Sequence, residues 1–401
     1  METSTQPIPD TKEIAQKTVY SILFSIAFAH LLNDLLQSVI PSVYPILKEK
    51  YDLTFTQIGL ITFAYQMAAS ILQPFVGLYT DKKPKPFSQI FGMLFTLAGI
   101  VSLSLASHFY SIIVSVILVG IGSSIFHPEA SRISFLASGG KRGLAQSVFQ
   151  LGGNAGTAIG PLLVALIVVP KGQFYIIGFV IIALIALVVL SRIAFWYQNH
   201  LNLRAKKKTE IILPDLSQRQ IITSVVILLV LIFSKFFYMA GMSSYFTFYL
   251  IEKFHVSIPD AQFHLFLFLA SCAIGTLLGG PLGDKFGRKY VIWFSVLGAA
   301  PFSLLLPYAD LFWTGTLSVI IGIIISSAFP AILVYAQELL PKKLGMVSGL
   351  FYGFAFGMGG LGSAILGYVA DLYGIEYVYR ICAFLPLIGI IAFFLPNLKK
   401  K

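Results

Sequence analysis

Twelve apolar runs, each about 20 residues long or longer, follow one another along this chain of 401 residues. A run of that length crosses the hydrocarbon core of a bilayer as an α-helix, because the backbone must satisfy its own hydrogen bonds there. Of all residues 57% are hydrophobic and 11% are charged, against about 25% charged in soluble domains. The sequence therefore predicts an all-α polytopic membrane protein. We expect its spans near residues 20–47, 55–79, 87–107, 110–135, 143–169, 174–197, 221–252, 259–283, 289–307, 311–338, 344–370 and 376–396.

The positive charges indicate the orientation of these spans. An even number of spans places both termini on one side of the membrane. Of the 28 Lys and Arg residues, 22 fall on that side, 5 on the other, and one, Lys235, inside a span. Because cytoplasmic loops are enriched in Lys and Arg, we predict that both termini are cytoplasmic. The same bias explains the net charge of +11 without a nucleic-acid partner.

The two halves of the chain resemble each other. Gly120 and Pro128 recur 202 residues later as Gly322 and Pro330, and other pairs keep this offset to within one residue. Parallel halves of six spans predict two pseudo-symmetric six-helix bundles with a binding site at midplane between them. The predicted organisation is a cytoplasmic N-terminal segment over 1–19, a bundle over 20–198, a basic cytoplasmic linker over 199–220, a second bundle over 221–396 and a cytoplasmic tail over 397–401.

Ionisable side chains inside the spans are the first candidates for function, because a charge at the bilayer centre costs about 2.5–3.5 kcal/mol on insertion scales. A carboxyl that faces a low-dielectric cavity can carry a proton, and Arg can hold an anionic group with two parallel hydrogen bonds. We predict that Asp34, Glu129 and His127 carry coupling protons. We predict that His30, Asn33, Arg132, Lys235 and Tyr238 contact an anionic substrate.

Structural roles remain as alternatives for the same residues. Asp34 and Lys235 could form a buried ion pair that holds the two halves together. Glu129 and Arg132 could form an i,i+3 pair at the end of their helix, and His127 could make an inter-helix hydrogen bond.

A motif near the middle of the second half identifies a family. GPLGDKFGRK (Gly280 to Lys289) resembles the Gly-x-Leu-x-Asp-Arg-x-Gly-Arg-Arg signature of the major facilitator superfamily. The first-half copy, GLYTDKKPKP (Gly77 to Pro86), has Pro84 where the second glycine of the signature stands. The resemblance implies the major facilitator fold, in which helices 1, 4, 7 and 10 line a central cavity. It also implies a conformational role for Gly77, Asp81, Lys82, Gly280, Asp284, Lys285, Gly287 and Arg288.

The two aspartates of this motif have a specific expected partner. The resemblance implies that Asp81 and Asp284 each face a helix N-terminus across their own half. There the helix dipole favours a carboxylate by about 0.3–1 kcal/mol.

Longer stretches are similar to the bacterial fosmidomycin resistance proteins. They include HLLNDLLQSVIPSVYPILKEKY (His30 to Tyr51), FHPEASR (Phe126 to Arg132) and GLAQSVFQLGGNAGTAIGPLL (Gly143 to Leu163). The resemblance implies a secondary active transporter of the bacterial inner (cytoplasmic) membrane. It would export fosmidomycin-like small anionic drugs by proton antiport with alternating access, as a lipid-embedded monomer. The alternative is a proton-coupled importer of an organic anion or a phosphorylated metabolite.

One further pattern concerns helix packing. GGNAGTAIGP places Gly152, Gly156 and Gly160 on one face of the fifth span, followed by Pro161, and such a face lets another helix approach closely. The sequence contains no nucleophile elbow, no metal-ligand spacing and no Walker lysine loop, so we expect neither an enzyme nor a metal or cofactor site.

Overall fold

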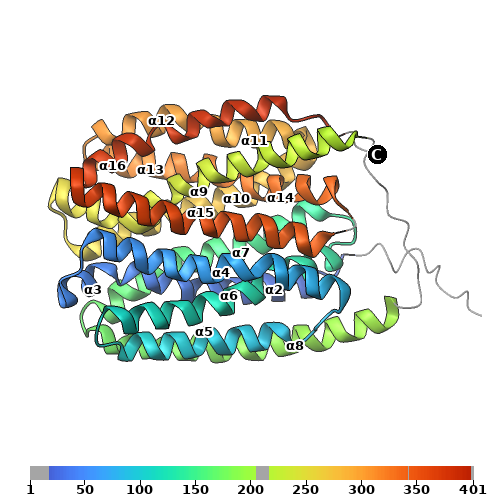
Figure 1. The fold of residues 1–401 in the computed structure, drawn as a ribbon, viewed down its shortest axis with the longest axis horizontal. Coiled ribbons are helices and arrows are strands. Elements are labelled where there is room, and N and C mark those ends of the chain that lie inside the picture. The colour runs from blue at the N-terminus through green and yellow to red at the C-terminus, as the bar shows by residue number, and fades with distance from the viewer. Residues whose placement is uncertain (1–17, 205–215, 342, 399–401) are drawn as a thin grey trace, which may run out of the picture.

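The computed structural model describes residues 18–204, 216–341 and 343–398. Within these ranges the regular structure is helical, and twelve helical stretches are long and apolar enough to cross a membrane (Figure 1). Each overlaps one predicted span, which confirms the predicted fold class. The predicted N-terminal segment up to residue 17, the basic linker from residue 205 to 215 and the last three residues of the tail lie outside the described residues.

The N-terminal half contains the first six spans. They are α2 (Tyr20–Ser42) continued by α3 (Tyr44–Tyr51), α4 (Phe55–Lys82), α5 (Ser88–Leu105), α6 (Phe109–Ala137), α7 (Arg142–Leu163) continued by the π-helical η1 (Val164–Val168), and the 3-10 segment η2 (Gln173–Phe179) continued by α8 (Val180–Arg204).

The C-terminal half contains the last six spans. They are α9 (Gln218–Phe254), α10 (Ile258–Phe286), α11 (Arg288–Leu297) continued by α12 (Ala300–Leu305) and η3 (Leu306–Tyr308), α13 (Leu311–Ser326) continued by α14 (Ala328–Leu339), α15 (Leu344–Tyr373), and α16 (Ile375–Cys382) followed by η4 (Leu385–Phe394).

Local sequence signals explain where several helices begin and break. The first turn of a helix leaves N–H groups without backbone partners, and Thr54 with Gln57 satisfies them at α4 through a capping box. Ser217 with Gln220 does the same at α9. The tenth span breaks at residue 327, between α13 and α14, three residues before Pro330, which lacks the N–H that would continue the ladder.

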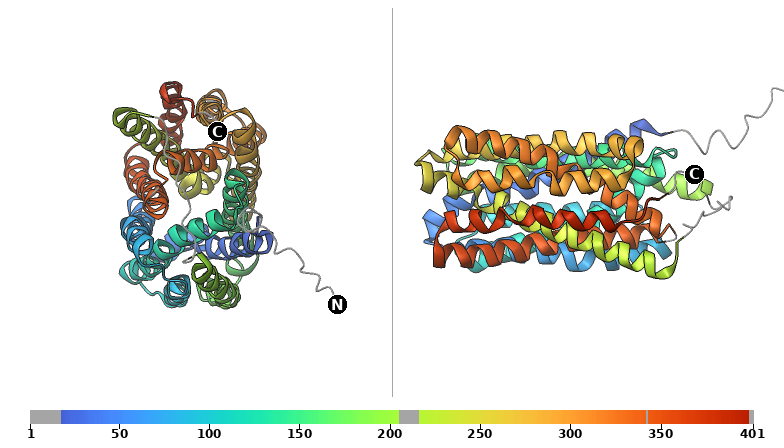
Figure 2. Two further views of the ribbon diagram at one scale, coloured as in Figure 1. Left: turned by 90° about the vertical axis from the view of Figure 1, so that its right-hand side faces the viewer. Right: turned by 90° about the horizontal axis from the view of Figure 1, so that it is seen from above.

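All spans run along one long axis, and the two halves lie side by side (Figure 1). The first and last described residues lie at the same end of the bundle (Figure 2), which we call the terminal end. The end at which α3 and α16 lie is the opposite end. Large apolar side chains such as Phe75, Leu166 and Phe312 are exposed around the bundle, and this surface is suited to lipid rather than to water.

The halves meet along two pairs of helices, α4 with α15 and α7 with α10. Glycine permits the approach, because a Cβ on Gly77 would collide with the carbonyl of Gly345, and a Cβ on Gly280 would lie 2.6 Å from the carbonyl oxygen of Gly143. The two glycines come from the two copies of the motif. Each copy therefore brings its helix to backbone distance from a helix of the other half.

Within the N-terminal half, α7 packs just as closely against α2. A Cβ on Gly152 would meet the carbonyl of Ala27, and one on Gly156 would meet the carbonyl of Leu31. Gly160 faces the side chain of Ser38 in the same way. Pro161 lies inside α7, one turn before the π-helical stretch. The glycine face predicted for helix packing thus lies on α2.

We predict that Gly152→Ala destabilises the protein, whereas Gly178→Ala does not. The added methyl at position 152 has no room beside Ala27, while a Cβ at Gly178 would meet nothing within 4 Å. Overpacking of this kind costs about 1–3 kcal/mol, so the thermal aggregation midpoint of the detergent-purified variant should fall clearly. Equal midpoints for the two variants would contradict the close α2–α7 contact.

Candidate functional site

A central cavity of about 160 Å³ lies between the two halves. Its lining divides sharply by chemistry. The N-terminal half contributes polar side chains throughout: His30, Asp34, His127, Gln150, Asn154 and Thr157. The C-terminal half contributes mostly apolar and aromatic ones with a single cation: Lys235, Phe236, Met239, Leu269, Cys272, Thr276, Ser326, Phe329, Tyr352 and Phe356. A ligand in the cavity would therefore meet a polar wall on one side and an apolar wall with one ammonium group on the other.

Three side chains of the polar wall form a compact group, which we call the Asp34 cluster: His30, Asp34 and His127. His30 Nε2 lies 3.1 Å from Asp34 Oδ2, and His127 Nε2 lies 3.6 Å from Asp34 Oδ1. Asn33 donates to Asp34 Oδ1 over 2.9 Å but does not itself line the cavity. The cluster is part of the cavity wall and joins α2 to α6.

Backbone carbonyls fix the orientation of both imidazoles. His30 Nδ1 lies 2.8 Å from the carbonyl oxygen of Phe149, and His127 Nδ1 lies 3.1 Å from that of Ser123. A carbonyl accepts hydrogen bonds and does not donate, so His30 Nδ1 carries its proton. His127 Nδ1 also lies 3.2 Å from the Ser123 hydroxyl, which can donate or accept, so either tautomer of His127 fits these contacts. In neutral His30 the Nε2 atom is then a bare acceptor that faces the carboxylate. A proton shared with Asp34 relieves the repulsion between these lone pairs.

Packing around the cluster leaves room for it. A Cβ on Gly153 would lie 2.5 Å from His30 Nε2 and 2.7 Å from Asp34 Oδ2, so α7 can pass there only with glycine. One nitrogen or oxygen atom from each residue of the cluster lies within 4.8 Å of those from the other two, a spacing that would admit a small cation. The sequence predicts no metal site.

Lys235 is the cation of the opposite wall. Its side chain is 5% exposed, and its Nζ lies 5.5 Å from the ring centroid of Phe236 and 5.4 Å from that of Phe329. Among the described residues it forms no ion pair, so the alternative of a buried pair with Asp34 is not what the structure shows. A buried ammonium held by aromatic faces alone leaves its hydrogen-bond donors available to a ligand.

Hydrogen bonds between the halves close the cavity toward the terminal end. The Tyr352 hydroxyl of α15 donates to Gln150 Oε1 over 2.6 Å and accepts from Gln146 Nε2 over 2.9 Å. Beside it, Ser131 of α6 bonds Ser348 of α15 over 3.3 Å. The sequence does not predict a role for these residues in closing the cavity, because an uncharged Tyr or Gln is not unusual in a span.

Arg132 and Glu129 lie closer to the terminal end and outside the cavity lining. Arg132 pairs with Glu129 over 3.1 Å and with Asp81 over 2.6 Å, and it donates to the carbonyl of Thr80 over 2.6 Å. The guanidinium is thus fully engaged within the N-terminal half and is not free to bind a substrate. The alternative of a structural i,i+3 pair describes Glu129 and Arg132 better.

Asp81 completes this network and contacts the other half. It accepts hydrogen bonds from the backbone N–H groups of Gly345 over 3.2 Å and Met346 over 2.9 Å, at the start of α15. Our expectation that this aspartate faces a helix of its own half is therefore wrong. The carboxylate of α4 caps α15 at the terminal end, where unpaired N–H groups and the helix dipole both favour it.

The opposite end of the same helix pair carries a matching contact. Asp371, at the end of α15, accepts from the backbone N–H of Phe55 over 3.0 Å and from that of Thr56 over 2.8 Å, and from the Thr56 hydroxyl over 2.5 Å. The antiparallel helices α4 and α15 therefore cap each other at both ends. Gln262 of α10 adds a bond to the carbonyl of Ser42 on α2 over 2.9 Å. Both ends of the central cavity are crossed by bonds between the halves.

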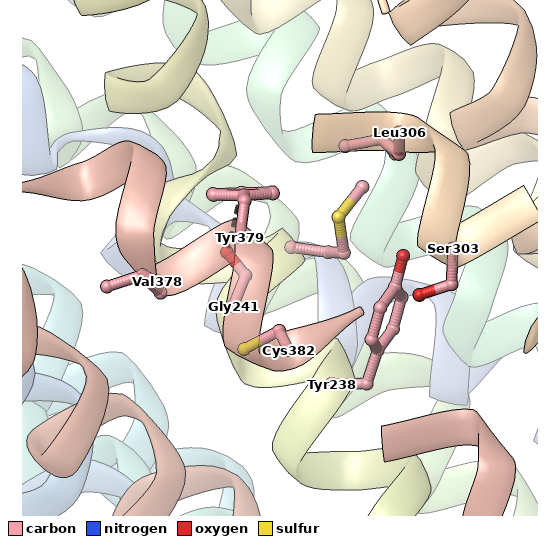
Figure 3. Close-up of a pocket in the computed structure, with 8 residues that line it drawn as sticks. Tyr238, Gly241, Ser303, Leu306, Val378, Tyr379 and Cys382 are labelled. Atoms are coloured by element: carbon pink, nitrogen blue, oxygen red, sulfur yellow. Dashed lines mark hydrogen bonds between the residues drawn. The ribbon is translucent and has the colours of Figure 1, made fainter. Parts of the chain in front are cut away.

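Tyr238, which the sequence places among the candidate substrate contacts, does not line the central cavity. Its ring faces a cavity of about 10 Å³ inside the C-terminal half, beside Ser303 and Cys382 (Figure 3). That space is roughly what one water molecule needs, so Tyr238 belongs to the packing of α9 against α12 and α16.

The remaining motif residues lie at the terminal end. Arg288 forms an ion pair with Glu338 over 2.6 Å, and Gly287 adopts a φ of 99° between α10 and α11, which glycine tolerates best. Lys285 lies 5.2 Å from the ring centroid of Phe286, and Lys82 is exposed in the last turn of α4. The side chain of Asp284 lies outside the described residues.

Comparison with known proteins gives the class. The family model described as "Major Facilitator Superfamily" matches residues 26–258 and 247–401. Among solved structures, FucP in the outward conformation has a TM-score of 0.67 at 18% identity, covering 94% of this chain and 98% of that one. The human organic anion transporter MFSD10 has a TM-score of 0.72 at 16% identity, covering 95% and 100%. At these identities the structures support the fold alone. The chain belongs to the major facilitator superfamily, and it is a multi-pass membrane transporter of small molecules.

Sequence relatives narrow the class further. The chain is 56% identical over 407 residues to the fosmidomycin resistance protein of Escherichia coli K12, covering 100% of both chains. It is 44% identical over 386 residues to an uncharacterised transporter of the same superfamily from Bacillus subtilis 168, YfnC, covering 96% of this chain and 94% of the relative. The relationship extends over the full length of both halves.

We predict that Asp371→Ala opens the opposite end, whereas Asp310→Ala does not. Asp371 accepts three hydrogen bonds across the halves, and Asp310 caps α13 inside its own half. Losing bonds to a charged acceptor costs about 1.5–3 kcal/mol.

The measurement is the distance between spin labels on Glu49 of α3 and Glu376 of α16, both exposed near that end. The Asp371 variant should gain a population at longer distance. An unchanged distribution would show that this cap does not hold the opposite end closed.

Proposed function

We propose that this protein exports small anionic drugs of the fosmidomycin type in exchange for protons, by alternating access and without chemical change of the substrate. The observation that carries the proposal is the central cavity, where a buried lysine with no ion pair among the described residues faces a histidine–aspartate–histidine cluster on the other wall. The 56% identical relative named for fosmidomycin resistance supports the choice of substrate. In this proposal each half supplies the binding site for one of the two exchanged species, the proton or the drug.

Lys235 serves as the anion site in this proposal. Hydrogen bonds to a charged group contribute about 1.5–3 kcal/mol, and the effect is larger away from water. The rings of Phe236 and Phe329 keep water from the ammonium group. Arg132, Asn33 and Tyr238 are not assigned to the substrate, because none of them lines the cavity.

Asp34 serves as the proton site, together with His30 and His127. Its carboxylate is 17% exposed and lies at the cavity wall, where it can be reached when either end opens. Glu129 is not assigned to coupling, because its carboxylate pairs with Arg132 away from the cavity.

The caps of α4 and α15 fit alternating access. Opening toward the terminal end would break the bonds of Asp81 to α15, and opening toward the other end would break those of Asp371 to α4. We assign the terminal end to the cytoplasm from the distribution of basic residues, in the bacterial inner membrane. Lipids surround the apolar belt, and a monomer contains the whole cavity.

We predict that substitutions on the two walls of the cavity impair different activities in proteoliposomes. Lys235→Met should weaken fosmidomycin binding about tenfold or more, because the one lysine among the described lining residues is removed. Asp34→Asn should abolish fosmidomycin-driven proton movement while the drug still binds. Tyr238→Phe is the matched control outside the cavity and should retain both activities. Full coupling in Asp34→Asn would exclude Asp34 as the proton site.

The direction of transport is tested in cells. Overproduction should make a sensitive bacterium resistant to fosmidomycin, because the drug leaves the cytoplasm. The alternative of an importer predicts hypersensitivity instead. The Asp34→Asn variant, produced to the same level, should confer no resistance.

A further inference from the structure

We infer that a substrate exchanged for a proton here must carry two groups, an anion for Lys235 and a hydrogen-bond donor for the Asp34 cluster. The inference rests on the proposed function and names the substrate class that the cavity can couple. Anions without a donor would bind but would not displace the proton.

The effect of a bound proton on anion binding decides whether the two can be exchanged. Exchange requires that proton and substrate exclude each other from the same conformation. A proton added to the Asp34 cluster makes the cavity more positive by one charge. That change strengthens the attraction of the cavity for an anion at Lys235. An anionic group alone therefore favours binding together with the proton, which is the wrong sign for exchange.

When the Asp34 cluster is deprotonated, the polar wall presents hydrogen-bond acceptors there. Because His30 donates from Nδ1 to the carbonyl of Phe149, the deprotonated cluster presents at least two acceptors: His30 Nε2 and the carboxylate of Asp34. His30 Nε2 is buried and has no hydrogen-bond partner among the described residues. This atom needs a donor, which a proton or a ligand hydroxyl can supply.

The other three polar residues of that wall are hydrogen-bonded to groups outside the cluster. Asn154 donates to Thr276 and to the carbonyl of Cys272, and Thr157 donates to the carbonyl of Gly153 over 3.0 Å. Gln150 accepts from the Tyr352 hydroxyl. The demand for a donor is therefore concentrated at the Asp34 cluster.

The surrounding titratable groups do not supply it either. Lys235 stands on the opposite wall and contacts aromatic rings. Tyr352 of α15 donates to Gln150, Tyr65 of α4 donates to Gln37, and Cys272 of α10 lies on the wall of Lys235. A ligand donor at Asp34 would thus replace the proton, while its anionic end reaches Lys235 across the cavity. The aromatic wall between them suits a short carbon chain.

Two phosphonates that differ in one group test the inference on the unmodified protein. 3-Hydroxypropylphosphonate has a hydroxyl where butylphosphonate has a methyl. Binding to the purified full chain is measured by calorimetry in buffers of different ionisation enthalpy, at several values between about pH 5.5 and 7.5. This measurement counts the protons released or taken up with each ligand.

We expect both phosphonates to bind, with Lys235→Met weakening both about tenfold or more. The hydroxyl compound should release up to about one proton more per molecule bound than butylphosphonate does, because the ionisation of the phosphonate group itself is common to both ligands. His30→Gln and Asp34→Asn should each reduce the release while butylphosphonate still binds. In liposomes the hydroxyl compound alone should drive proton movement.

Equal proton release with both ligands would overturn the inference while leaving an anion exporter intact. A failure of both phosphonates and of fosmidomycin to bind, or binding that ignores Lys235, would instead remove the anion site and with it the proposed function. The comparison of two ligands on one protein does not depend on whether a variant folds.

Discussion

Along α4 and α15 the two halves touch at the level of the backbone, because glycine stands where a larger side chain would hold them apart. Gly77 lies against Gly345 near one end, and Gly349 and Gly353 lie against the carbonyls of Gln73 and Ser70 further along. Such contacts are tight but involve little interdigitation of side chains, so one helix can tilt against the other without repacking a core. The position of the cavity, the closure of its ends and the reach of each capping aspartate all depend on this spacing.

The cavity that this contact encloses has its two sets of ionisable groups on different halves. The His30, Asp34 and His127 side chains belong to α2 and α6, and the Lys235 ammonium group belongs to α9. A relative movement of the halves therefore changes the distance between the two charges directly. Isolated charges are costly in a bilayer, so a movement of the halves acts most strongly on these two charged groups at the centre of the protein. Arg132 and Glu129 form an ion pair inside the N-terminal half, so a movement of the halves does not separate their charges.

The sequence predicted the spans well, because bilayer thickness sets their length and leaves few alternatives. It also predicted that Asp34, His127 and Lys235 reach the cavity, since a charge in a span must face protein or water. It could not separate Arg132 and Tyr238 from the cavity residues, because a position along the span does not tell which neighbour a side chain meets. The partners of Asp81 were missed for the same reason, as they lie 264 and 265 residues away. Asp371 ends its span just as Asp81 does, and that likeness was the signal available.

The reciprocal capping of α4 and α15 has a thermodynamic consequence. Each end carries one carboxylate on the first N–H groups of the facing helix, so opening either end breaks bonds of the same kind. In the exchange proposed above, the gradients across the membrane set the net direction of transport, and reversing those gradients would run the same protein backwards.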